Sequence, residues 1–132
     1  QLLRMQSGLY TPSPGSRTDA LYFGGSTVAE TAAVAPLETA PGTRFRYANN
    51  DTLLAARALM VDLGEAGPAF PYTHLLWPIG MTRTTIELDW AGAPILSSQV
   101  WMTARDLARL ALLHLDDGVW NGQRLLPENW VR

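Results

Sequence analysis

The 132-residue sequence has no cysteine, little charge and no long apolar run. Without cysteine, the chain contains no disulfide, no thiolate metal site and no cysteine nucleophile. No apolar stretch approaches the roughly 18 residues that a membrane-spanning helix needs. The net charge of -2 provides no basic field, so the electrostatic footprint of a nucleic-acid-binding protein is absent. The lack of cysteine fits a reducing compartment such as the cytoplasm and is also compatible with the periplasm.

The composition is that of a globular domain. Hydrophobic residues make up 47% of the chain and charged residues 17%, whereas a disordered chain is poorer in apolar and richer in charged residues. A chain of 132 residues is long enough to bury a substantial core. We therefore expect residues 1–132 to form a single domain.

Both ends of the sequence have the patterns of interrupted helices. Residues 1–5 predict the last turns of a helix that ends at Ser7 and Gly8, with Gly8 in the left-handed conformation. Pro127 to Trp130 predict a first helical turn, where proline loses no hydrogen bond. The sequence starts at Gln1, with neither an initiator methionine nor a signal-peptide pattern. We therefore expect a fragment excised from a longer protein.

The order of patterns along the chain predicts a mainly helical domain with long loops and little sheet. A capping box with aspartate in place of glutamate opens the best predicted helix, and Gly64 is a natural stop for another. The predicted elements are a surface loop over 10–26, short helices over 27–34 and 70–76, a helix from Asn50 or Asp51 to about Leu63, an extended segment over 84–88, a helix from Thr103 to about Leu115, and a tight turn around Asn121 and Gly122.

The segment from Pro41 to Asp51 carries the strongest signal for chemistry. It places Tyr47 and Asn49 two residues apart in a loop just before a predicted helix. A phenol can carry a proton and a carboxamide can orient a neighbouring group, and both can reach one cavity from an irregular loop. The alternatives are a tyrosine packed on the helical core, and an asparagine that forms an Asx-turn or shares the helix cap with Asn50 and Asp51.

This segment, PGTRFRYANND, resembles the pattern PGxxFxYSNxx, the second motif of the serine-reactive penicillin-recognising enzymes. That family comprises class C β-lactamases, DD-peptidases and related esterases and amide hydrolases. Tyr-x-Asn alone is a weak signal, but further matches follow the family's order through nearly the whole chain. They are 2–9 to LLxHxSGL, 76–81 to IfxPLGM with Ile79 for the usual leucine, 97–109 to STARDLARF, and 117–131 to the DGVWNGxRILPExWV seen in aminohexanoate-dimer hydrolases.

The resemblance implies a fold in which a helical domain packs against an α/β domain, with the active site between them. Residues 1–132 would be the helical domain of this serine β-lactamase/DD-peptidase-like α/β fold. The nucleophile motif of the family is Ser-x-x-Lys, and all ten basic residues of this chain are arginine. Its third motif, Lys-Thr-Gly or His-x-Gly, has no match either, because neither His74 nor His114 is followed by x-Gly.

By resemblance, Tyr47 would take the proton of the absent serine and later return it to the leaving group. A cation beside a phenol favours loss of its proton. In the family this cation is the lysine of the nucleophile motif, while Arg44 and Arg46 are the nearest cations in this sequence. Asn49 would hydrogen-bond that lysine or the substrate amide, and Ala48 between them would point away.

The implied function is that of a serine hydrolase which cleaves a small amide or ester through an acyl-enzyme and needs no cofactor. Its partner would be the α/β domain of the same protein. Without that domain an apolar face of the helical domain would be open, so self-association is expected. The alternative is a different class of protein, a non-catalytic helical module that binds a partner, or a degenerate family member.

Histidine and serine offer no competing catalytic site. His74 and His114 are forty residues apart, with no second ligand at helical spacing, so packing roles are favoured over a metal site. Ser97 and Ser98 lie in a predicted loop without an adjacent general base, and we interpret them as structural.

Two further groups of residues have structural interpretations. Three tryptophans near glycine-rich loops either line a substrate cleft or anchor the core. Three charged residues indicate a capped and salt-bridged helix start. These groups are Trp90, Trp101 and Trp120, and Arg105, Asp106 and Arg109.

Overall fold

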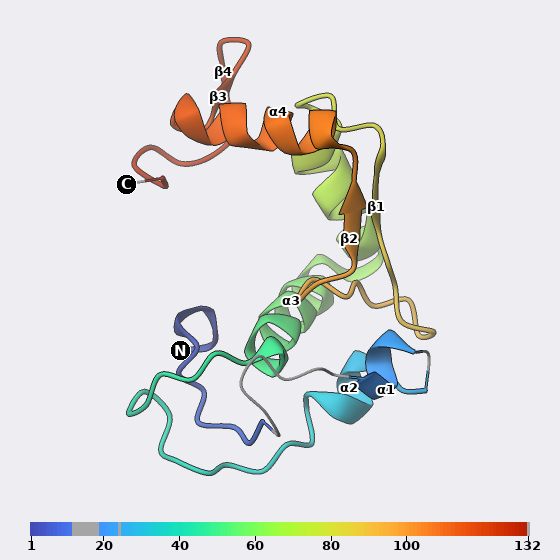
Figure 1. The fold of residues 1–132 in the computed structure, drawn as a ribbon, viewed down its shortest axis with the longest axis vertical. Helices are drawn as coiled ribbons and strands as arrows, with labels where there is room; N and C mark the ends of the chain where they lie inside the picture. The colour runs from blue at the N-terminus through green and yellow to red at the C-terminus, as the bar shows by residue number, and fades with distance from the viewer. Residues whose placement is uncertain (12–18, 24, 132) are drawn as a thin grey trace. The chain divides into compact units, whose positions relative to one another are not determined.

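The computed structural model describes residues 1–11, 19–23 and 25–131, with the backbone alone for residues 19 and 20. The chain divides into two compact units, whose elements Figure 1 traces along the chain. Unit 1 comprises Gln1–Pro68 and Ile86–Val100, and unit 2 comprises Ala69–Thr85 and Trp101–Arg132. The expectation of one domain over residues 1–132 stays a prediction.

Unit 1 is built from one long helix, short helical turns and ordered loops. Its long helix ends at Gly64, whose positive φ of 58° stops it as the sequence predicts. The short helix predicted over 27–34 is present but brief. The helices are η1 (Leu2–Arg4), α1 (Asp19–Tyr22), α2 (Val28–Thr31) and α3 (Asn49–Leu63), and η2 (Gly64–Ala69) follows α3.

The surface loop predicted over residues 10–26 is wrong in part, because residues 19–22 form α1. Leu21 of this short helix is buried in the core of the unit, so tertiary packing stabilises a turn that its glycine, proline and serine neighbours disfavour. The part of the predicted loop over 12–18, and residue 24, lies outside the described residues.

The core of unit 1 joins α1, α2 and α3 to the returning segment over 86–100. Apolar burial of this kind is the main favourable term in folding. The buried cluster consists of Leu21, Val28, Ala32, Leu53 and Ile95, with Tyr22, Leu54 and Ala93 packed against it.

A capping box that the sequence analysis missed begins α2. The Thr27 hydroxyl accepts the Glu30 N–H at 3.2 Å, and the Glu30 carboxylate accepts the Thr27 N–H at 2.9 Å. The N–H of Thr27 thereby holds the pKa of Glu30 below its usual value. The carboxylate of Asp89 adds a second cap from the returning segment, by accepting the Val28 N–H at 2.8 Å.

The helix predicted to end at Ser7 and Gly8 ends at Met5 instead. η1 is a single 3-10 turn, and Met5 takes the left-handed conformation that stops it, with φ 53°. Gly8 also has a positive φ, of 79°, but serves a different purpose. Its carbonyl accepts the N–H groups of Glu38 at 2.8 Å and Thr39 at 3.3 Å, so two distant stretches of backbone approach closely there.

We expect Gly8→Ala to lower the free energy of unfolding by about 2 kcal/mol or more, because the added Cβ is both strained and obstructed. An ideal Cβ at Gly8 lies 2.2 Å from the Thr39 carbonyl oxygen, whereas one at Gly92 meets nothing within 4 Å although its φ of 84° is similar. Gly92→Ala is therefore a matched control that carries the backbone strain alone, about 1 kcal/mol. Urea unfolding of both variants measures the difference, and equal losses would show that Thr39 moves aside.

The helix cap predicted at Asn50 or Asp51 is also wrong. α3 begins at Asn49, and its N-cap Ala48 makes no side-chain capping bond. Asp51 is almost fully buried and accepts two hydrogen bonds from Ser7, from its hydroxyl at 2.5 Å and from its N–H at 3.2 Å. The carboxylate thus fastens the N-terminal segment to the first turn of α3, where a negative charge is also favoured by the helix dipole.

Unit 2 contains the second long helix and a hairpin. The amphipathic helix predicted from Thr103 to about Leu115 is confirmed. The Asn121 and Gly122 turn is confirmed too, with φ values of 48° and 81° that suit a two-residue hairpin loop. The elements are η3 (Tyr72–Leu76, a π-helix), α4 (Ala104–Leu115), β3 (Val119–Trp120) and β4 (Gln123–Arg124).

Of the two hydrogen bonds of the capping box predicted at the start of α4, the structure shows the one that the Thr103 side chain accepts. Thr103 accepts the Asp106 N–H at 3.2 Å. The buried Asp106 carboxylate, however, accepts the Arg83 N–H at 2.9 Å and the Thr84 hydroxyl at 3.0 Å, and pairs with Arg109 at 3.0 Å. Aspartate is one methylene shorter than the glutamate of a full box, and here it ties the helix start to the segment over 83–84.

Residues 127–130 form a turn and not the predicted helix start. The Trp130 N–H donates to the Pro127 carbonyl at 3.1 Å, and Asn129 has a φ of 64° that a right-handed helix does not accept.

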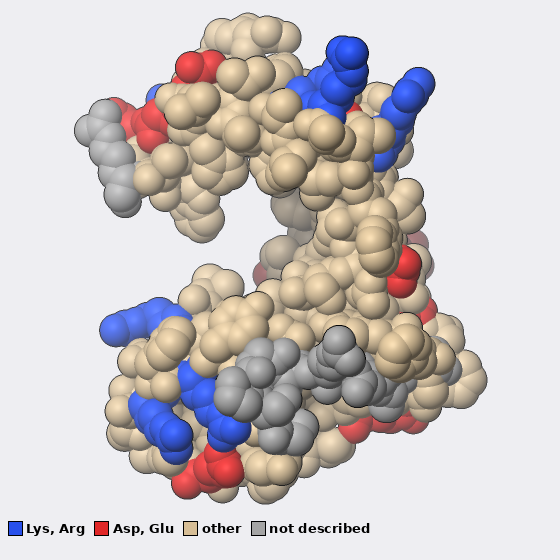
Figure 2. All heavy atoms as spheres, viewed as in Figure 1, with Lys and Arg blue, Asp and Glu red and all other residues tan. Residues whose placement is uncertain are grey.

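Sheet is scarce among the described residues, as the sequence predicts. The extended segment predicted over 84–88 contains β1 (Thr84–Ile86), which pairs with β2 (Val100–Met102), and β3 pairs with β4 in antiparallel register. Of the helices that the structure describes, none is long and apolar enough to cross a membrane. On the face drawn in Figure 2 most of the surface is uncharged, and charges of both signs occur in small separate groups.

Candidate functional site

The segment that carries Tyr47 runs beside the N-terminal segment of unit 1. The Gly42 N–H donates to the Gln6 carbonyl at 2.8 Å, and the Arg46 N–H donates to the Met5 carbonyl at 3.0 Å. The Ser7 and Asp51 pair fastens the same two stretches a few residues further on. The residues before and after Tyr47 are therefore held in place by main-chain and buried side-chain hydrogen bonds.

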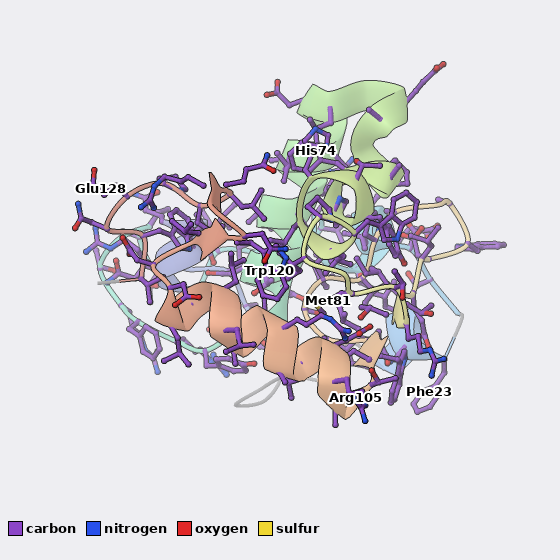
Figure 3. All side chains as sticks on the ribbon, turned by 90° about the horizontal axis from the view of Figure 1, so that it is seen from above. Phe23, His74, Met81, Arg105, Trp120 and Glu128 are labelled. Carbon is purple, nitrogen blue, oxygen red and sulfur yellow. The ribbon has the colours of Figure 1, made fainter. Side chains whose placement is uncertain are left out.

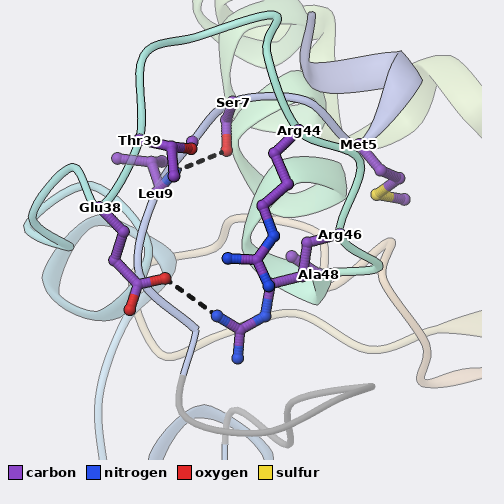
Figure 4. A pocket seen from close by; sticks show the side chains of 9 residues that line it. Met5, Ser7, Leu9, Glu38, Thr39, Arg44, Arg46 and Ala48 are labelled. Carbon is purple, nitrogen blue, oxygen red and sulfur yellow. Dashed lines mark hydrogen bonds and ion pairs between the residues drawn. The ribbon is translucent and has the colours of Figure 1, made fainter.

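Alternate residues of this segment face a small cavity, which Figure 4 shows from close by. Arg44, Arg46 and Ala48 line it, together with residues of the N-terminal segment. The cavity has a volume of about 10 Å³, which is too small for a substrate. Arg46 is engaged there, because its guanidinium pairs with Glu38 at 2.9 Å and donates to the Thr11 carbonyl at 2.6 Å.

Tyr47 is one of the alternate residues of this segment that face the solvent and not the cavity. Its side chain is 53% exposed and that of Phe45 is 66% exposed, whereas Ala48 is buried. Among the described residues, none forms a hydrogen bond with the Tyr47 hydroxyl. The structure thus leaves the phenol accessible to a molecule from outside, and it does not pack Tyr47 into the helical core.

Asn49 occupies the first helical position of α3 and is buried. Its Nδ2 donates to the Tyr22 hydroxyl oxygen at 3.0 Å, and that hydroxyl lies 3.1 Å from the Ser97 Oγ. The Asn49 amide nitrogen is therefore held by a residue from α1. Asn49 does not share the helix cap, as one alternative interpretation proposed, because the N-cap position of α3 is Ala48. Tyr22 was missed as a partner of Asn49 because its segment has the composition of a loop.

The two histidines have local partners in unit 2. His74 stacks on Phe70 with ring centroids 4.2 Å apart, and its Nδ1 lies 2.8 Å from the Thr73 hydroxyl. The His114 Nδ1 lies 2.8 Å from the Leu110 carbonyl oxygen one helical turn earlier. Within the part of the chain that the structure describes, no three histidine, cysteine or acidic residues come together as metal ligands would. The structural role of the two histidines stays a prediction.

The tryptophans do not anchor a core. The side chains of Trp90 and Trp101 are 77% and 61% exposed. Trp120 is half-buried and lies over α4, where Figure 3 labels it, and it lines an open hollow with Arg105 and Arg109. Arg109 pairs with Asp106 as the helix-start interpretation predicts, whereas Arg105 is exposed.

Solved structures of two other proteins share this fold. One is a protein from Bacillus anthracis provisionally described as a 6-aminohexanoate-dimer hydrolase, with a TM-score of 0.77 and 24% identity over 98% of this chain and 39% of that protein. The other is a protein from Bacteroides dorei DSM 17855 provisionally described as a beta-lactamase, with a TM-score of 0.74 and 23% identity over 98% of this chain and 40% of that protein.

At sequence identities of 24% and 23%, these similarities establish the fold and nothing about function. The chain spans about two fifths of the length of each of the two proteins. The sequence itself is informative over its full length, because the model of one protein family matches residues 1–132. This match shows the family that the sequence resemblance predicted: the chain belongs to the beta-lactamase family.

Proposed function

We propose that this chain is the helical part of a serine hydrolase that resembles class C β-lactamases and cleaves an amide or ester through an acyl-enzyme. Membership of the beta-lactamase family supports a hydrolase. The chain has no lysine, so a Ser-x-x-Lys nucleophile would come from residues outside this sequence. The rest of the catalytic cleft would come from an α/β domain of the same protein.

The observation that carries the proposal is the placement of Tyr47. Its phenol is half exposed on a segment that hydrogen bonds hold on both sides, at Arg46 and at Asp51. A general base or acid needs both features, because its proton must be reachable and its position must be reproducible.

In the proposed reaction Tyr47 acts as a phenolate, which the lysine of the nucleophile motif would stabilise, and it accepts the proton of the serine hydroxyl while the serine oxygen adds to the substrate carbonyl. The tetrahedral intermediate then expels the amine or alcohol, which receives the proton from Tyr47, and an acyl-enzyme remains. Water then attacks the acyl-enzyme and gives one proton to Tyr47. Tyr47 passes this proton to the departing serine oxygen, so the acid is released and both the serine hydroxyl and the phenolate are regenerated. Asn49 would orient the lysine of the nucleophile motif or the amide of the substrate.

The proposed substrate is a small amide or ester. The description of the B. anthracis protein names the 6-aminohexanoate dimer as what that protein hydrolyses, and residues 117–131 of this chain resemble the motif seen in such hydrolases. Substrate preference in a common fold is set by the site and its loops, so the proposal extends to the bond that is cleaved and not to a particular compound.

We expect the complete protein to form a covalent acyl adduct on a serine outside residues 1–132. The test is to incubate the protein with a fluorescent penicillin and with p-nitrophenyl acetate, quench within the burst phase, and map the adduct by peptide mass spectrometry. The control is a variant of the complete protein in which the serine of the Ser-x-x-Lys motif is replaced by alanine, so that no acyl adduct can form there. An adduct on a serine of this chain, such as Ser97 or Ser98, would contradict the proposal, as would turnover without any adduct.

A further inference from the structure

We propose that Tyr22 is a positioning residue that fixes the orientation of the Asn49 carboxamide during turnover. This inference rests on the proposed function, in which Asn49 orients a catalytic group or the substrate. It concerns a tyrosine that the motif pattern does not contain, 27 residues away from Asn49 in the sequence.

The hydrogen bond between the two residues has a defined direction. The Asn49 Nδ2 can only donate, so the Tyr22 hydroxyl oxygen, 3.0 Å away, accepts. The phenol then retains its own proton and a further lone pair for the Ser97 Oγ at 3.1 Å. Three side chains from α1, the start of α3 and the returning segment over 86–100 are thus joined in a row.

The ring of Tyr22 is well suited to hold an amide still. Tyr22 ends α1, and its ring packs against the buried cluster around Leu53 and Ile95. Asn49 is itself buried in the first turn of α3. Rotation about the last side-chain torsion of asparagine is broad when no partner restricts it, so a partner with a fixed ring restricts the amide strongly.

Asn49 stands two residues after the exposed Tyr47, on the same hydrogen-bonded framework. A rotation of its amide would therefore change which of its two ends is presented to the reacting groups. The physical role of Tyr22 is to remove this freedom before the substrate binds, which is the kind of preorganisation from which catalysis gains most.

The test is a double-mutant cycle on the complete protein, with p-nitrophenyl acetate as substrate. We expect Tyr22→Phe to lower kcat/KM about three- to tenfold, the usual effect of one neutral hydrogen bond. Phenylalanine keeps the ring in the core, so the variant should fold, which thermal unfolding checks. In an Asn49→Ala background the same change should have almost no further effect, because the group on which Tyr22 acts is gone.

Ser97→Ala is the matched control. It removes one further partner of the Tyr22 hydroxyl but leaves the bond to Asn49, so kcat/KM should change less than about twofold. Additive losses in the double variant, an unchanged Tyr22→Phe enzyme, or an equal loss in Ser97→Ala would each overturn the role of Tyr22. Should Asn49→Ala itself be as active as the parent, the role of Asn49 in the proposed function fails instead.

Discussion

Replacement of Tyr47 by phenylalanine in the complete protein is expected to lower kcat by roughly two to four orders of magnitude, the usual span for the loss of a positioned general acid or base. The variant retains the ring but has no proton to transfer. Tyr47 is half exposed and its hydroxyl has no hydrogen-bond partner among the described residues, so the free energy of unfolding should hardly change. Steady-state kinetics on an ester substrate and a thermal unfolding curve measure the two quantities together.

Tyr10→Phe is the control for this change, because Tyr10 is also an exposed tyrosine of unit 1 and has no place in the proposed reaction. Its kcat should stay within about twofold of the parent. Asn49→Ala should impair turnover more mildly than Tyr47→Phe, since an amide orients and does not transfer protons. If a folded Tyr47→Phe protein keeps a kcat within a few-fold of the parent, Tyr47 is a surface residue without a catalytic role.

The second large effect concerns the 132-residue chain by itself. We expect it to hydrolyse neither nitrocefin nor p-nitrophenyl esters above the uncatalysed rate. Without a Ser-x-x-Lys serine, Tyr47 has no hydroxyl to deprotonate, and removal of a nucleophile alone abolishes nearly all of the rate enhancement in serine hydrolases. The measurement is initial rates for the isolated chain and for the complete protein at equal concentration.

A burst of product from the isolated chain, with a stoichiometry near one, would contradict this expectation and place a nucleophile within residues 1–132. Heat-inactivated chain is the appropriate control, because exposed histidine side chains accelerate the hydrolysis of activated esters slightly without any organised site.

Local patterns in the sequence predicted those elements whose stability is local. Thr103 begins α4, Gly64 ends α3, and the Asn121 and Gly122 pair turns the hairpin, because a cap or a positive φ acts on its own neighbours. The prediction of the α3 cap failed because the polar side chain concerned forms hydrogen bonds with a distant segment. Asp51 was predicted to cap its own helix, but it accepts both hydrogen bonds of Ser7, 44 residues away.

The candidate site also contains residues that the sequence indicated and one that only the structure revealed. The spacing of Tyr47 and Asn49 and the collinear motifs indicated the family, and the match over residues 1–132 confirmed it. Tyr22 could not be found from the sequence, since nothing in its own segment relates it to Asn49 or to Ser97, 75 residues further on. A local sequence pattern shows which chemical groups one stretch of chain contains, but not which distant side chains will contact them.

The sequence by itself therefore determined the family, the two candidate catalytic residues, the cap of α4 and the end of α3. Only the tertiary structure decided that Tyr47 is accessible, that Arg46 is engaged by Glu38, and that the Asn49 amide is held by Tyr22. The physical reason is that exposure and hydrogen-bond partners depend on which segments pack together, and buried polar groups accept whichever partner that packing brings within reach.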